Sequence, residues 1–207
     1  MYHPRSNEHR AGDGGPHYID DSDIHMAEYT LVAEKTGELR MNAADKEERY
    51  ATLAAQIEAT LAGEPDLTAA MASITCLLHN GFAYYFWTGF YRRVGPTRLL
   101  VGAYQGTLGC LDIDFTRGVC GACATRRETI IVDDVHAFPG HIACDSASAS
   151  EIVVPVFDAR GELIAVLDVD STIPAAFDEV DERWLERFVA LLREKEPLPV
   201  VWSAPAP

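Results

Sequence analysis

The sequence predicts an α+β domain in which helices from both ends of the domain flank one central, mainly antiparallel β-sheet. Three observations support this fold class. Apolar residues recur at helical spacing near residues 45–81 and again at 178–192, and strand-like segments fill the interval between these flanks. With 207 residues and 48% hydrophobic content, the chain can bury one substantial core, so we predict a single domain.

Two helices open the predicted domain. From Asp45 onward, apolar residues follow a helical period until the breaker sequence Gly63-Glu64-Pro65 ends the segment. Asp66 can cap a second helix, which ends at Gly81. Each segment therefore has one apolar face to bury.

Strand-like segments follow these helices. Residues 83–93 (AYYFWTGFYRR) and 98–104 (RLLVGAY) have the aromatic and β-branched composition of two adjacent antiparallel strands. Residues 110–115 (CLDIDF) alternate as a third strand. The segment 118–129 (GVCGACATRRET) predicts a helix entered through a glycine turn, and 129–134 (TIIVDD) predicts a short buried strand.

A hairpin and a helix close the domain. After a loop at about 135–150, residues 151–157 (EIVVPVF) and 162–170 (ELIAVLDVD) flank the turn sequence DARG and predict a hairpin. Asp178 can cap a final helix, and we interpret its acidic run, Asp178–Glu186, as a solvated helix start. The apolar side of this helix comprises Val180, Trp184, Leu185, Phe188, Val189 and Leu192.

The predicted domain spans residues 43–197. Residues 1–42 carry scattered apolar residues without a period and the breaker run AGDGGP, so we predict a flexible or disordered extension. Residues 198–207 form a short tail.

Charge and hydropathy exclude several classes of partner. The net charge is −15, from 32 acidic and 17 basic residues, whereas nucleic acids and anionic membrane surfaces attract basic patches. No apolar run approaches the roughly 18 residues that a membrane span needs, and the amino terminus lacks the pattern of a secretory signal. We therefore predict a cytoplasmic protein that binds neither nucleic acid nor membranes.

The cysteine pattern leaves metal binding, redox chemistry and packing as alternatives. The chain has five cysteines, an odd number that argues against a structural disulfide framework. Four of them follow the spacing C-x9-C-x2-C-x20-C, at Cys110, Cys120, Cys123 and Cys144; the fifth is Cys76.

The cysteine spacing matches neither the full motif of a structural zinc site nor that of a thioredoxin-like protein. A structural zinc site would need His136 and His141 as its second ligand pair and would leave two thiols unused, so we predict no metal site. The unit Cys120-Gly-Ala-Cys123 at a helix start would favour a thiolate at Cys120. Thioredoxin-like chemistry requires a βαβ context, which the preceding strands do not provide.

Several sequence strings together resemble the free methionine-R-sulfoxide reductases, which are GAF-domain enzymes. The resemblance covers about residues 43–195 and implies a GAF-like fold and the reduction of free methionine-(R)-sulfoxide without a cofactor. The strings are WTGFY from Trp87 to Tyr91, GTLGC ending at Cys110, GVCG around Cys120, DDVHAFPGHIACDSASASEIVVPV and LDVDS from Leu167 to Ser171.

The resemblance also implies roles for three cysteines. Cys144 matches the attacking thiol, Cys110 the usual resolving partner and Cys120 a second recycling thiol, whereas Cys76 and Cys123 match no functional position. A thioredoxin-like reductant would then restore the thiols. Because GAF domains often pair through their terminal helices, a homodimer is the corresponding expectation.

The chemistry also needs an acid near the sulfoxide oxygen. Asp168 and Asp170 alternate on one predicted strand and so share a face, and Glu151 begins the partner strand. Carboxylates that share a pocket raise the pKa of at least one of them. We predict that Glu151 is the acid and that Asp168 and Asp170 orient it and hold the substrate ammonium group.

Trp87 and Tyr91 are four residues apart on a predicted strand, so they would wall the pocket on one face. The simpler interpretation is that both belong to ordinary sheet core. We interpret His136 and His141 as structural loop residues and do not assign them to the site.

Two other functions remain as alternatives. A non-catalytic GAF sensor would bind a small molecule or respond to redox state without turnover, although we expect the extension and tail to be too short for an effector domain. A zinc-stabilised interaction module would contain stoichiometric metal on purification.

Overall fold

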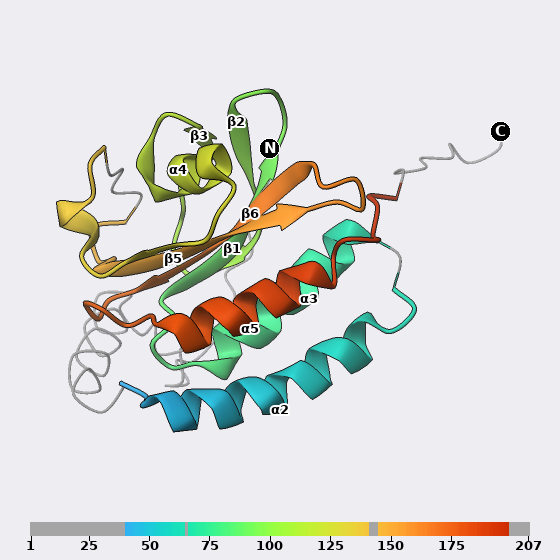
Figure 1. The fold of residues 1–207 in the computed structure, drawn as a ribbon, viewed down its shortest axis with the longest axis horizontal. Helices are drawn as coiled ribbons and strands as arrows, with labels where there is room; N and C mark the ends of the chain where they lie inside the picture. Colours follow the sequence, from blue (N-terminus) through green and yellow to red (C-terminus); the bar gives the residue numbers. More distant parts are fainter. Residues whose placement is uncertain (1–39, 65, 141–144, 199–207) are drawn as a thin grey trace, which may run out of the picture. The chain divides into compact units, whose positions relative to one another are not determined.

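Six strands form one antiparallel sheet in the order β3-β2-β1-β6-β5-β4 (Figure 1). The computed structural model describes residues 40–64, 66–140 and 145–198. Every strand pair within these residues is antiparallel, which confirms the predicted α+β class. The strands are β1 (Trp87–Arg93), β2 (Arg98–Gln105), β3 (Asp112–Asp114), β4 (Ile130–Val132), β5 (Ser150–Phe157) and β6 (Leu163–Ser171).

Helices cover both faces of the sheet (Figure 1). On one face α3 (Leu67–Gly81) and α5 (Glu179–Ala190) pack against the strands, and α2 (Ala43–Leu61) packs on these two helices. On the other face α4 (Gly118–Arg126) packs over β5 and β6 and encloses a second apolar cluster. The sheet therefore separates two cores.

The predicted caps form at the starts of α3 and α5. The Asp66 carboxylate accepts a hydrogen bond of 2.7 Å from the backbone N–H of Ala69. The Asp178 carboxylate accepts one of 2.8 Å from the backbone N–H of Val180, and Asp181 completes a capping box. These caps satisfy N–H groups that have no partner inside the helix.

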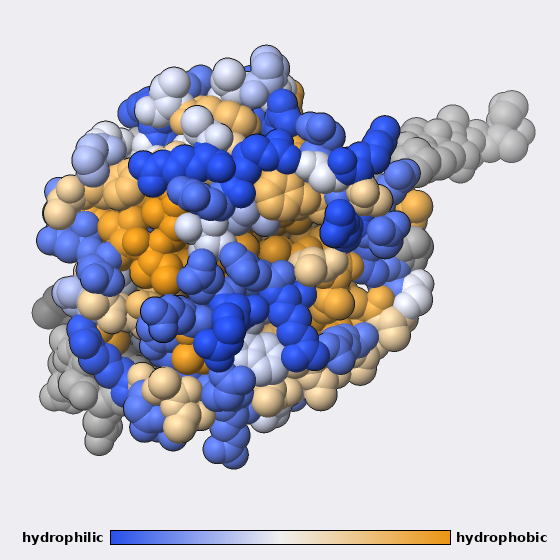
Figure 2. Space-filling model, viewed as in Figure 1, coloured by the Kyte–Doolittle hydropathy of each residue, from blue (hydrophilic) through white to orange (hydrophobic). Residues whose placement is uncertain are grey.

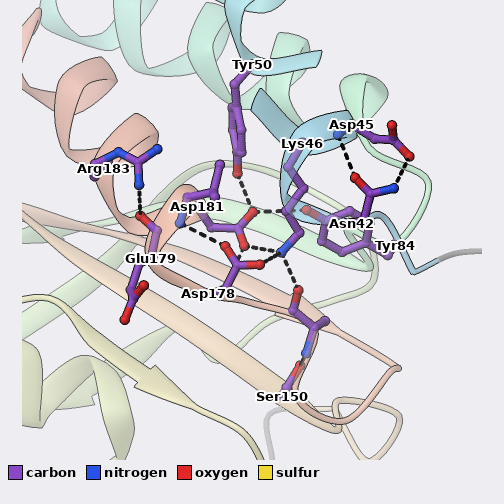
Figure 3. Close-up of polar contacts among 12 residues, drawn as sticks. Asn42, Asp45, Lys46, Tyr50, Tyr84, Ser150, Asp178, Glu179, Asp181 and Arg183 are labelled. Carbon is purple, nitrogen blue, oxygen red and sulfur yellow. Dashed lines mark hydrogen bonds and ion pairs between the residues drawn. The ribbon is translucent and has the colours of Figure 1, made fainter. Parts of the chain in front are cut away.

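A largely buried ionic network joins α2 to α5 (Figure 3). We call it the Lys46–Asp181 network, and its members are Lys46, Tyr50, Tyr84, Asp178 and Asp181. Lys46 is only 2% exposed and contacts both aspartates. The hydroxyls of Tyr50 and Tyr84 donate to Oδ1 of Asp181 at 2.8 and 3.0 Å. Asp181 is 0% exposed, so the interpretation of the whole acidic run as solvated is wrong at this position.

Some predicted boundaries are also wrong. The first strand begins at Trp87, and not at residue 83, because the chain turns at residues 83–84 and the Tyr84 and Tyr85 rings enter the helix-side core. The predicted third strand shortens to β3, since Leu111 is exposed before it. A 3₁₀ helix, η1 (Val135–Ala137), forms within the predicted loop.

The surface follows the same layers. In the view of Figure 2, apolar side chains are visible chiefly at the level of the sheet, whereas polar side chains cover most of the helical side. No helix among the described residues is both long enough and apolar enough to cross a membrane. Most of the predicted extension and tail lie outside the described residues.

Candidate functional site

Three carboxylates meet on the α4 side of the sheet, as the strand alternation predicts. The register of β5 and β6 places Glu151 opposite Asp170, and the register of β1 and β6 places Trp87 opposite Asp170 on the other side. Gly89 lies opposite Asp168. Side chains directly opposite one another on antiparallel strands lie on the same face, so these residues form one row across the sheet.

The row opens into a cavity between the sheet, α4 and the loop after β2. Both predicted aromatic residues and all three predicted carboxylates line it. The full lining is Trp87, Tyr91, Leu108, Gly109, Ile113, Gly118, Val119, Cys120, Asp145, Ser148, Glu151, Asp168 and Asp170.

Stacked aromatic rings form one wall of the cavity. The Trp87 ring stacks on Tyr91 with centroids 5.6 Å apart and on Tyr104 at 5.3 Å. Gly89 makes this stacking feasible, because a Cβ at this position would lie 2.6 Å from the Trp87 ring. The indole N–H of Trp87 donates to the carbonyl of Thr107 at 3.0 Å, which fixes the ring.

Two polar lining residues, Asp145 and Ser148, were not among those that the sequence nominated. Asp145 accepts a hydrogen bond of 2.6 Å from the Thr107 hydroxyl, which ties the loop after β2 to the segment before β5. Ser148 is buried and its hydroxyl hydrogen-bonds Asp170. Both belong to the string HIACDSASASE, so position within that string was the available signal.

Burial favours the protonated form of each carboxylate. It raises the pKa of Glu151 well above the ordinary value, and the charges of Asp168 and Asp170 add to this effect. Desolvation by burial also raises the pKa of Asp170, and the charge of Asp168 adds to this rise. The pKa of Asp168 rises only to about 6, because hydrogen bonds from Cys120 and Glu151 oppose the effect of burial. The site therefore keeps its protons to a higher pH than exposed carboxylates would.

Cys120 enters the cavity from the first turn of α4. The helix can approach the sheet edge because residue 121 is glycine: a Cβ there would lie 2.6 Å from the carbonyl oxygen of Asp114. Burial and the nearby charges of Asp168 and Glu151 raise the pKa of the Cys120 thiol. The expectation of a thiolate from the helix terminus alone is therefore wrong, because desolvation outweighs the dipole.

The remaining cysteines are spread over the fold. Cys144 lies outside the described residues. Cys110 is half-buried beside the cavity-lining residue Gly109 and is disulfide-bonded. Cys76, Cys120 and Cys123 are free thiols; Cys123 is a buried residue of α4, and Cys76 is exposed on α3. The structure thus brings Cys120, Glu151, Asp168, Asp170, Trp87 and Tyr91 together around one cavity.

Comparisons with known proteins agree with this architecture. Residues 63–193 match the family model of the GAF domain. GAF domain-containing protein A from Dictyostelium discoideum is 43% identical over 75% of this chain and 97% of its own length. The free methionine-R-sulfoxide reductase of Escherichia coli (strain K12) is 41% identical over 72% of this chain and 90% of its own.

A solved structure gives the same match in three dimensions. It is described as a free methionine-R-sulfoxide reductase from Neisseria meningitidis in complex with its substrate. It is 41% identical, with a TM-score of 0.69, over 75% of this chain and 93% of that one.

Proposed function

Because the chain belongs to the GAF-domain family of free methionine-R-sulfoxide reductases, we propose that it reduces free L-methionine-(R)-sulfoxide to L-methionine. The observation that carries this proposal is the cavity lined by both an aromatic wall and three carboxylates, of which Glu151 and Asp168 are buried. An aromatic wall suits the methyl-sulfur end of the substrate. Carboxyl groups with raised pKa values suit the protonation of a sulfoxide oxygen.

The proposed reaction uses the thiolate of Cys144 as nucleophile. Its sulfur attacks the sulfoxide sulfur, and the sulfoxide oxygen takes up a proton. The resulting hydroxyl then moves to the Cys144 sulfur as its bond to the substrate sulfur and the transient sulfur–sulfur bond break, so the two products are methionine and a sulfenic acid on Cys144. The thiol of Cys110 or Cys120 then displaces water from the sulfenic acid to form a disulfide. A thioredoxin-like dithiol reduces this disulfide, which suits action in the reducing cytoplasm.

We assign the proton transfer and the binding of the substrate ammonium group to the three carboxylates. Glu151 donates the proton to the sulfoxide oxygen. Asp168, whose pKa rises only to about 6, accepts a hydrogen bond from Glu151 and orients it. Asp170, beside Trp87 across the strands, holds the substrate ammonium group with Asp168. A pocket that holds both the α-amino and the α-carboxylate group of the substrate leaves no room for a continuing peptide chain. This accounts for a preference for the free amino acid.

The direct test uses the separated R and S epimers of methionine sulfoxide with dithiothreitol as reductant. We expect methionine from the R epimer and none from the S epimer. A methionine sulfoxide flanked by peptide bonds serves as the matched substrate control and should remain unreduced. Calorimetric binding of the R epimer without methionine formation would instead support the GAF sensor alternative.

Glu151→Gln tests the acid. A general acid acts only while protonated, so turnover falls as pH rises through its pKa, and burial moves that fall above the ordinary carboxyl range. We expect kcat to drop by about 10²–10⁴-fold and the alkaline limb to disappear from the pH profile. Glu162→Gln changes an exposed carboxylate in the turn of the same hairpin and should leave both unchanged. An unaltered kcat in Glu151→Gln would remove Glu151 from the acid role.

A further inference from the structure

One corner of the cavity gathers three side chains of the types that bind zinc. The sulfur of Cys120 and one oxygen each of Glu151 and Asp168 lie within 4.8 Å of one another, and all three residues are buried. They come from α4, β5 and β6, so the fold assembles them. Zinc bonds of about 2.0–2.3 Å place tetrahedral ligands roughly 3.5 Å apart, so small side-chain rotations suffice to surround one ion.

A second observation points to a ligand at this corner. Oδ1 of Asp168 is buried without a hydrogen-bond partner among the residues that the structure describes. Asp168 is 6% exposed and lines the cavity. A buried oxygen without a partner is costly, and a cation in the cavity would satisfy it.

The local charge favours a divalent cation. When ionised, Cys120, Glu151 and Asp168 carry three like charges in a desolvated site, and Asp170 lines the same cavity. A zinc ion would offset this repulsion, and its preference for thiolate, together with carboxylate, matches the donor set.

We propose that Cys120, Glu151 and Asp168 bind a Zn²⁺ ion that occupies part of the substrate cavity and reversibly inhibits the enzyme. Zinc–sulfur and zinc–oxygen bonds form while any remaining S–H and O–H bonds of the ligands break, and the protons pass to solvent without change of oxidation state. Water takes the fourth position, toward the cavity. Inhibition rests on the proposed function, whereas ion binding does not.

This site differs from the zinc site that the sequence pattern suggests. That pattern would use the C-x-x-C unit with a histidine pair, whereas here only Cys120 of the unit takes part. Cys123 is one turn further along α4 and 0% exposed. Cys123 therefore provides a matched control thiol on the same helix.

The experiment titrates Zn²⁺, and Co²⁺ as its spectroscopic substitute, into the full-length reduced protein carrying Cys110→Ser and Cys144→Ser. These changes remove the attacking thiol and one of the two candidate resolving thiols, so binding is measured without turnover. We expect one Zn²⁺ per chain by calorimetry and a sulfur-to-cobalt charge-transfer absorption with Co²⁺. Adding Cys120→Ser should abolish both signals, Cys123→Ser should preserve both, and Asp168→Asn should weaken binding at least about tenfold.

Three results would overturn the assignment: no bound ion, cobalt absorption that survives Cys120→Ser, or unchanged affinity in a folded Asp168→Asn protein. Circular dichroism verifies the fold of each variant. In the wild-type chain, Zn²⁺ should raise the apparent KM for the R epimer, and a chelator should reverse this. Stoichiometric binding without any reductase activity would uphold the ion site and refute the proposed function; full activity with bound zinc would refute the overlap of ion and substrate.

Discussion

Replacement of Cys144 by serine is expected to lower the reduction of methionine-(R)-sulfoxide by about three orders of magnitude or more. Serine keeps the size of the side chain but has no thiolate, and its hydroxyl is a far weaker nucleophile near neutral pH. The measurement is methionine formation from the R epimer with dithiothreitol in excess.

The environments of the other cysteines explain why none should replace Cys144. Burial and neighbouring carboxylates hold the Cys120 thiol protonated, and burial likewise raises the pKa of Cys123. Cys76 lies on α3, on the opposite side of the sheet from the cavity. A protonated or distant thiol does not attack a poorly electrophilic sulfoxide sulfur.

Matched serine variants separate attack from resolution. Cys76→Ser and Cys123→Ser should retain wild-type turnover. Cys110→Ser combined with Cys120→Ser should still produce methionine in a single turnover but accumulate a sulfenic acid, detectable with a dimedone-type trap. Substantial multiple-turnover activity in Cys144→Ser would show that another group is the nucleophile.

The order of elements could be predicted because short-range patterns determine it. The periodic apolar positions of the first two helices and the pairing of the two hairpin strands are both present in the structure. The row of Glu151, Asp168 and Asp170 was predictable for the same reason, since alternation and hairpin pairing fix which side chains share a face. Exact strand ends were not, because the tyrosines before β1 find their partners in the helix-side core.

The properties that were mispredicted depend on tertiary burial. The helix start predicted a thiolate at Cys120, yet the approach of α4 to Asp114 buries that thiol beside two carboxylates. A lysine and an aspartate on amphipathic helices are ordinarily solvated, so no local pattern distinguishes Lys46 and Asp181 from their exposed neighbours. Only the packing of α2 against α5 shows that they are buried together.

That burial predicts a large effect on stability when the Lys46–Asp181 network is broken. Asp181→Ala should reduce the free energy of unfolding by about 3–5 kcal/mol, because it leaves the Lys46 ammonium buried with one remaining, partly exposed carboxylate. It also removes the acceptor for Tyr50 and Tyr84, and burial raises the pKa of both phenols, so they keep protons to donate. Urea unfolding followed by circular dichroism measures the change.

An exposed ion pair across the same two helices provides the control. Glu58 in α2 pairs with Arg187 in α5 at 2.7 Å, and both side chains are about half exposed. Glu58→Ala should therefore cost less than about 1 kcal/mol, because water replaces the lost partner at little expense. Any cost shared by the two variants would reflect the general contact between α2 and α5.

A double variant distinguishes loss of the ion pair from loss of packing. Lys46→Met combined with Asp181→Ala removes the stranded ammonium group along with its partner, so it should be more stable than Asp181→Ala alone. If the free energy of unfolding of the double variant instead falls by the sum of the losses in Lys46→Met alone and Asp181→Ala alone, the two side chains act independently. An Asp181→Ala loss no greater than that of Glu58→Ala would mean that water enters and satisfies the abandoned groups, contrary to their burial in the structure.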